Sequence, residues 1–146
     1  MSGVTGGGSH PRALRQLPAE ECMRLLAGVE LGRIVFTHHA LPAVRPVNHL
    51  VHNDEIIIRT HLGAAIASVI DGPGTVVAYE ADDIDAREHL GWSVIVTGRA
   101  HLIRDHEQIT RFLGLLRPWV TGEMDQVIRL RPELINGFEL TEDRYA

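Results

Sequence analysis

Lysine is absent from the sequence, and all fourteen basic residues are arginines. A site that would normally use lysine must therefore use arginine, histidine, a hydroxyl group or a backbone N–H. The single cysteine, Cys22, has no partner for a disulfide within the chain, and no signal-like apolar segment stands at the N-terminus. Both features favour a reducing cytoplasm. No run approaches the roughly 20 apolar residues of a membrane span, so membrane insertion is not expected.

An excess of positive charge is also missing, since the formal net charge is −5 and the pI is about 6.0. A general nucleic-acid-binding domain is usually basic, so this class is disfavoured. The 146 residues, of which 45% are hydrophobic, suffice for one domain with its own core and no metal or disulfide. The glycine-rich residues 1–16 are expected to be a flexible tail, and residues 17–146 the folded domain.

The hydrophobic pattern predicts a mainly β domain in which short strands follow one another along the chain. Helices are expected over 18–28, 63–70 and 105–116, and strands over 31–37, 43–51, 55–60, 75–80, 91–103, 126–130 and 134–140. The acidic segment 81–90 is expected to be a solvated loop. Mostly sequential strands without a βαβ rhythm indicate a small antiparallel barrel with helices packed on it.

Arg59 and Thr60 end a predicted strand, and Gly63 opens the next predicted helix. A guanidinium, a hydroxyl and the free N–H groups of a helix start are the donors that a phosphate dianion needs. The alternative is a surface arginine followed by an ordinary helix entry.

The strand segment Arg45-Pro46-Val47-Asn48 is the second candidate. Alternation places Arg45 and Val47 on one face and Pro46 and Asn48 on the other. Such a strand can lie along a flat heteroaromatic ligand, with Asn48 pairing with its polar edge and Arg45 supplying positive charge. The alternative is a solvated edge strand.

Trp92 and Ser93 begin the longest predicted strand, and Gly98 within it is expected to mark a bulge or a close backbone approach. The sequence also has nine histidines, including His38-His39 and the pair His49 and His52. Imidazoles on neighbouring strands can bind zinc or haem iron. No metal site is expected, because these side chains alternate between faces and no cysteine or carboxylate completes the set.

The order and spacing of these segments resemble the pyridoxamine 5′-phosphate oxidase-like flavin-binding family, the split-barrel flavoproteins. The resemblance spans residues 18–138, and Gly-Trp-Ser-Val-Ile-Val-Thr-Gly-Arg-Ala over 91–100 is its most specific part. Leu31-Gly32-Arg33 and Ile135-Asn136-Gly137-Phe138 give further support.

The resemblance implies a six-stranded antiparallel split barrel and a homodimer with FMN in grooves between the subunits. It implies that Arg45, Pro46, Val47 and Asn48 line the isoalloxazine ring and that Arg59 and Thr60, with Gly63 beside them, hold the phosphate. Trp92 and Ser93 would come from the partner subunit. The flavin performs hydride transfer in such a site, so no catalytic side chain is assigned.

The sequence departs from the family in two places. Ala65 stands where the family usually has a phosphate-binding lysine, so FMN is expected to bind more weakly unless His61 or Arg33 compensates. The C-terminal Arg-x-His of true pyridoxamine phosphate oxidases is absent, so vitamin B6 oxidation is not predicted.

The function that follows is an FMN-dependent oxidoreductase that reduces or oxidises a small molecule, with NAD(P)H as a possible reductant. Two alternatives stay open at this point. One is a reductase that uses the deazaflavin F420, and the other is a non-catalytic protein that binds flavin or haem.

Overall fold

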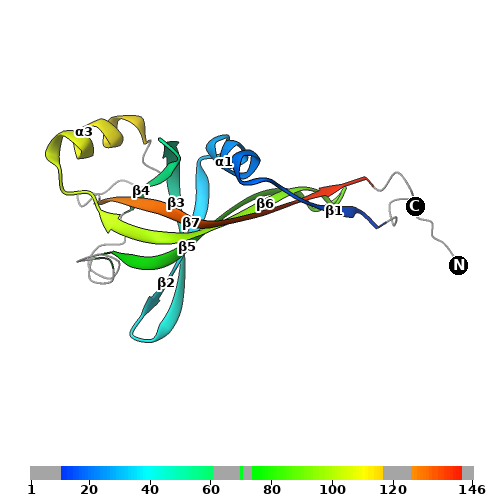
Figure 1. The fold of residues 1–146 in the computed structure, drawn as a ribbon, viewed down its shortest axis with the longest axis horizontal. Helices are drawn as coiled ribbons and strands as arrows, with labels where there is room; N and C mark the ends of the chain where they lie inside the picture. Colours follow the sequence, from blue (N-terminus) through cyan, green and yellow to red (C-terminus); the bar gives the residue numbers. More distant parts are fainter. Residues whose placement is uncertain (1–10, 61–69, 71–73, 117–125, 143–146) are drawn as a thin grey trace, which may run out of the picture.

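The computed structural model describes residues 11–60, 70, 74–116 and 126–142. Most of them lie in strands, which confirms the mainly β fold class, and two helices pack on the sheet (Figure 1). The elements are β1 (Ala13–Gln16), α1 (Ala19–Ala27), β2 (Leu31–His38), β3 (Leu41–His52), β4 (Glu55–Thr60), β5 (Thr75–Asp85), β6 (Leu90–Leu102), α3 (His106–Leu115) and β7 (Gln126–Thr141). In the described part of the chain, neither helix is long and apolar enough to cross a membrane.

Six of the strands close into a ring. The order is β7-β4-β3-β2-β5-β6, and β6 pairs back with β7, all antiparallel. This ring confirms the six-stranded antiparallel barrel that the family resemblance implied. The described residues add a seventh strand, because β1 pairs with the far end of β7 from Ala13 to Gln16. The prediction that these four residues belong to a flexible tail is therefore wrong.

Two-residue turns fix the register of the hairpins. Asn53 and Asp54 both have positive φ angles between β3 and β4, and His39 and Ala40 do so between β2 and β3. This is the geometry of the tight turns that match the strand twist. The β2–β3 hairpin projects from the barrel (Figure 1), because β2 pairs with β5 only from Arg33 to Val35.

Two strands are longer than predicted. β5 continues through Asp82–Asp85, paired with β6, where an acidic loop was expected. β7 is one strand instead of two, because the register shifts opposite Thr97 and Gly98 of β6, and the unpaired Glu133 of β7 forms a bulge beside Pro132. A Cβ on Gly98 would collide with the carbonyl of Arg131, so the expected close backbone approach is confirmed there. The predicted helix 63–70 lies outside the described residues, except for the buried Ile70.

The barrel interior is filled by alternate residues of the strands. Its buried side chains include Ile34, Val47, Ile56, Ile58, Tyr79, Val94, Val96, Ile128 and Leu130, with Met23 and Leu26 of α1 closing one end. A second cluster lies on the outer face of β4 and β7, where Phe112 and Leu116 of the α3 region cover Ile57 and Val127. The helix α3 therefore packs outside the barrel, on β4 and β7.

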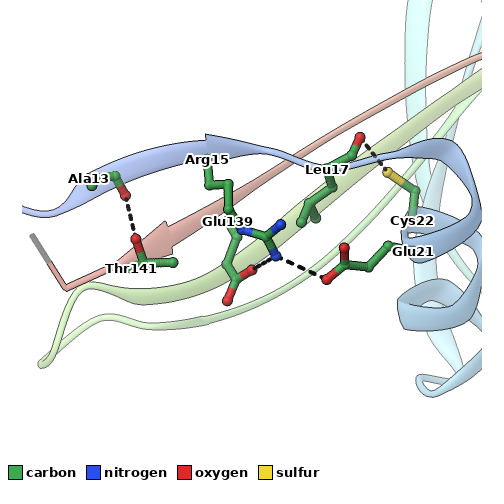
Figure 2. Close-up of polar contacts among 7 residues, drawn as sticks. All are labelled: Ala13, Arg15, Leu17, Glu21, Cys22, Glu139 and Thr141. Atoms are coloured by element: carbon green, nitrogen blue, oxygen red, sulfur yellow. Dashed lines mark hydrogen bonds and ion pairs between the residues drawn. The ribbon is translucent and has the colours of Figure 1, made fainter.

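β1 and α1 are fastened to β7 by a small polar network. Arg15 Nη2 lies 3.0 Å from a carboxylate oxygen of Glu21 in α1 and 2.6 Å from one of Glu139 in β7 (Figure 2). The same view shows the Thr141 hydroxyl directed at the Ala13 carbonyl and the Cys22 thiol at the Leu17 carbonyl. The pKa of Cys22 is raised, chiefly by burial, so its thiol stays protonated.

Candidate functional site

The two polar candidates of the sequence analysis meet on neighbouring strands. Asn48 of β3 and Arg59 of β4 are direct cross-strand partners, so their side chains share one face of the sheet. Ile57, two residues before Arg59, packs under α3 outside the barrel. Because side chains on a strand alternate, Asn48 and Arg59 both belong to the outer face. Asn48 is buried with 8% of its surface exposed, and Arg59 is half-buried.

The guanidinium of Arg59 contacts the C-terminal end of α3. Its Nη1 donates a hydrogen bond to the carbonyl of Leu116 at 2.6 Å and a longer one to the carbonyl of Leu113 at 3.4 Å. No sequence pattern pointed to these contacts, since more than fifty residues separate Arg59 from either carbonyl.

Thr60 follows Arg59 but lies on the opposite face by alternation, with 1% of its surface exposed. The two predicted phosphate ligands at the end of β4 therefore direct their side chains to different sides of the sheet. Gly63, Ala65 and His61 lie outside the described residues.

The segment 45–48 is divided by the same alternation. Pro46 is exposed on the outer face, opposite Arg33 of β2. Val47 is buried in the barrel core, so its side chain cannot reach a ligand on the outer face. Arg45 is exposed, and its Nη1 donates to the neighbouring carbonyl of Val44 at 2.9 Å. The structure thus brings together Pro46, Asn48 and Arg59 on one surface.

Trp92 and Ser93 lie on the far side of the ring. Ser93 is opposite Phe138 of β7 and Asp82 of β5, while Trp92 packs at the edge of the barrel core. β6 and β3 are three strands apart in a closed ring of six. Outward-facing side chains of these two strands point in opposite directions, so Asn48 and Ser93 of one chain cannot contact the same ligand.

Arg33 is neutralised by two carboxylates. Its Nη1 lies 2.9 Å from Glu80 and 3.5 Å from Asp82, both on β5. The pKa of Glu80 is raised, chiefly by burial and then by its hydrogen bond with Asp82. Arg33 and Asp82 border a cleft of about 610 Å³ that opens where β2 and β5 separate, lined also by Leu31 and Asp83. Arg33 of β2 is opposite Pro46 of β3, and Ala65, the position of the missing lysine, lies outside the described residues.

A buried polar pair lies inside the barrel. His49 Nε2 is 2.9 Å from the carbonyl of Leu26 at the end of α1, and the Tyr79 hydroxyl contacts His49 Nδ1. A carbonyl can only accept, so Nε2 carries the proton and Nδ1 accepts from Tyr79. Burial lowers the pKa of His49 and raises that of Tyr79, so both rings stay neutral near pH 7.

The other paired histidines lie apart from this core pair. The rings of His38 and His39 contact each other at the hairpin tip, and His52 packs against Phe112. Within the described ranges, no group of three histidine, cysteine or acidic side chains has a metal-binding arrangement.

Comparison with known proteins identifies the family. The family model for pyridoxamine 5′-phosphate oxidase matches residues 18–139. An uncharacterized protein of Mycobacterium tuberculosis is 48% identical over 135 residues, which cover 90% of this chain and 89% of that protein. The chain therefore belongs to the pyridoxamine 5′-phosphate oxidase family, as its sequence motifs indicated.

Solved structures share this fold over most of the chain. A candidate pyridoxamine 5′-phosphate oxidase of Corynebacterium glutamicum superposes with a TM-score of 0.76 at 30% identity, covering 88% of this chain and 99% of that one. The FAD-binding protein of Mycobacterium smegmatis gives a TM-score of 0.65 at 33% identity, with the same coverage. The second of these relatives is a flavin-binding protein by name.

Proposed function

We propose that this protein is a flavin-dependent oxidoreductase that holds the flavin phosphate at Arg59 and the ring along β3, between two copies of the chain. The pairing of Asn48 with Arg59 on the outer face carries the proposal, because it sets an amide beside a cation on one surface. The FAD-binding relative of Mycobacterium smegmatis, at 33% identity, supports a flavin as the ligand.

The residues on this surface suit the parts of a flavin nucleotide. The amide of Asn48 has both donors and an acceptor, as the polar edge of an isoalloxazine ring requires. Exposed Pro46 offers a flat apolar surface with no N–H left unpaired. The guanidinium of Arg59 suits a phosphate, since charge-assisted bonds from arginine to phosphate are strong and directional. Once bound, the flavin supplies the hydride chemistry, and the side chains position and stabilise it.

The proposed flavin site is completed by residues of a second copy of the chain. Ser93 faces outward on the side of the ring opposite Asn48, and the half-buried Trp92 lies next to it at the edge of the barrel core, so their proposed contact with the flavin requires the partner subunit. Neighbouring positions on the outer face of β6 and β7 expose the apolar side chains of Ile95, Leu134 and Phe138. An apolar sheet face of this kind is suited to a two-fold interface between identical chains.

FMN and FAD share the ring and the first phosphate, so Arg59 serves either cofactor, and we propose FMN as the smallest sufficient ligand. F420 and haem are distinguished from flavin by the absorption spectrum of the purified protein and by titration with each compound. A small-molecule substrate would reach the ring through the groove between subunits, with NAD(P)H as reductant. Turnover with NAD(P)H and an acceptor separates the enzyme from a flavin carrier.

The phosphate assignment is tested by titrating FMN and riboflavin into Arg59→Ala. Loss of a charge-assisted contact lowers FMN affinity by about 10- to 150-fold, while riboflavin, which has no phosphate, binds as it does to the unchanged protein. Arg24→Ala is the matched control, because this exposed arginine lies in the last turn of α1, away from the proposed site and interface. Equal FMN affinity of Arg59→Ala and Arg24→Ala contradicts the assignment.

A further inference from the structure

The C-terminal end of α3 receives hydrogen bonds from a different element. The last turn of α3 has no basic residue, and its C-cap residue, Leu116, has an extended backbone. The last carbonyls of a helix lack intrahelical partners and carry partial negative charge. Arg59 of β4 donates to two of these carbonyls, those of Leu116 and Leu113.

These carbonyls are held in place by the second core cluster. Phe112 and Leu116 are 2% and 3% exposed, and they pack with Ile57 and Val127 on the outer face of β4 and β7. Ile57 is two residues before Arg59 on the same face of β4. The same packing therefore fixes both the backbone of Arg59 and the carbonyls that accept hydrogen bonds from its Nη1.

We propose that the last turn of α3 is a positioning element for the cofactor phosphate, acting through Arg59. This inference rests on the proposed function, since it concerns the same arginine. A guanidinium has five N–H donors in a rigid fork, so one arginine can bind carbonyls through Nη1 and a phosphate through another nitrogen. A side chain that is already ordered loses less entropy when the ligand binds. Loosening α3 therefore weakens FMN binding without removing any group that contacts FMN.

Gly114 allows this to be tested away from the site. It lies in the last turn of α3 and is exposed, and a Cβ built on it has no atom within 4 Å. Gly114→Pro removes a helical N–H and clashes with the preceding turn, so it disrupts the end of α3. Gly114→Ala places a methyl group in open space and strengthens the helix, which makes it the matched control.

The experiment measures FMN and riboflavin affinities of the full chain for both Gly114 variants, each with Arg59 and with Arg59→Ala. Gly114→Pro is expected to weaken FMN binding about 2- to 12-fold, the range for ordering one long side chain. Gly114→Ala binds FMN at least as tightly as the unchanged protein, and riboflavin affinity does not move. In the Arg59→Ala background, Gly114→Pro has no further effect, because the positioned group is gone.

Three outcomes overturn the inference. The first is a folded Gly114→Pro protein whose FMN affinity is unchanged. The second is that Gly114→Pro lowers FMN affinity by the same factor when Arg59 is already replaced by alanine. The third is that Gly114→Pro lowers riboflavin affinity as much as FMN affinity. If Gly114→Pro does not fold, Leu115→Gly, at a position 59% exposed, loosens the same turn and is expected to act in the same direction. Failure of the unchanged protein to bind FMN refutes the proposed function as well, and is thereby distinguished from a failure of positioning alone.

Discussion

Inside the barrel, two side chains form a chain of hydrogen bonds. The Tyr79 hydroxyl contacts His49, and His49 in turn contacts the Leu26 carbonyl at the end of α1. The sequence marked His49 only as a possible metal ligand paired with His52. Its actual partners come from β5 and α1, which lie far from it in sequence, so no local pattern could show them. Burial is the main cause of the lowered pKa of His49. Folding therefore favours the neutral ring.

Acid is expected to destabilise the protein through His49. Between the lowered folded pKa and the ordinary value of 6.5, the unfolded chain binds more protons than the folded one. The contribution of the neutral His49 ring to the free energy of unfolding is fully present above about pH 6.5. It falls as the pH drops below this value, by at most about 1.4 kcal/mol per pH unit. Urea unfolding between pH 5 and 8 measures the slope. His49→Gln should flatten it, and an identical slope in this variant would refute the role of His49.

Gly32 is the residue that makes room for Tyr79. A Cβ at this position would collide with the Tyr79 ring and hydroxyl inside the barrel. Gly32→Ala is therefore expected to cost about 1–3 kcal/mol of unfolding free energy through overpacking. Gly114→Ala is the control, because its methyl group meets nothing. Chemical denaturation compares the two, and a Gly32→Ala protein as stable as the control would contradict this account.

Among the elements, core strands were predictable and peripheral ones were not. Apolar, β-branched runs identified β2, β4 and β6, and the turn after His52 implies the register that pairs Asn48 with Arg59. The predicted β5 ended too early, at Glu80, because the acidic residues that follow contribute little to the core. β7 was divided at Pro132, since only the tertiary bulge opposite Gly98 accommodates that proline. β1 is too short and polar to recognise without its partner strand.

Helix α3 is expected to depend on Phe112 for its place on the barrel. This side chain is 2% exposed and lies in the second core cluster with Ile57 and Leu116. Phe112→Ala should lower the unfolding free energy by about 3–5 kcal/mol. Leu115→Ala, on the exposed side of the same helix, should change it by less than about 0.5 kcal/mol. Equal effects of the two substitutions in denaturant titrations would show that α3 is not anchored by this cluster.

At the scale of the whole molecule, closure of the ring places the two halves of the proposed flavin site on opposite sides of one chain. The sequence analysis predicted residues of both halves: Asn48 and Arg59 for one, and Trp92 and Ser93 for the other. That they cannot meet within one copy follows only from the closed strand order. The homodimer remains a prediction, and two experiments address it.

The outer face of β6 and β7 is expected to form the interface. Ile95 is 44% exposed and lies diagonally between Leu134 and Phe138 on this face. Ile95→Glu should convert a dimer to a monomer in sedimentation experiments and abolish flavin binding, because burying an unpaired charge is costly. Thr110→Glu, at an exposed position in the middle of α3, should leave both unchanged. If Ile95→Glu sediments like the unchanged protein, the interface lies elsewhere.

A mixing experiment tests most directly whether each flavin lies between two chains. Arg59→Ala and Trp92→Ala chains, which should each bind FMN poorly alone, are denatured together, refolded and titrated with FMN. If Arg59 of one chain and Trp92 of its partner share a site, about a quarter of the sites in a random mixture contain both residues and bind FMN with full affinity. If the mixture binds FMN no better than the separate variants, the two residues do not share a site across the interface, and the account is contradicted.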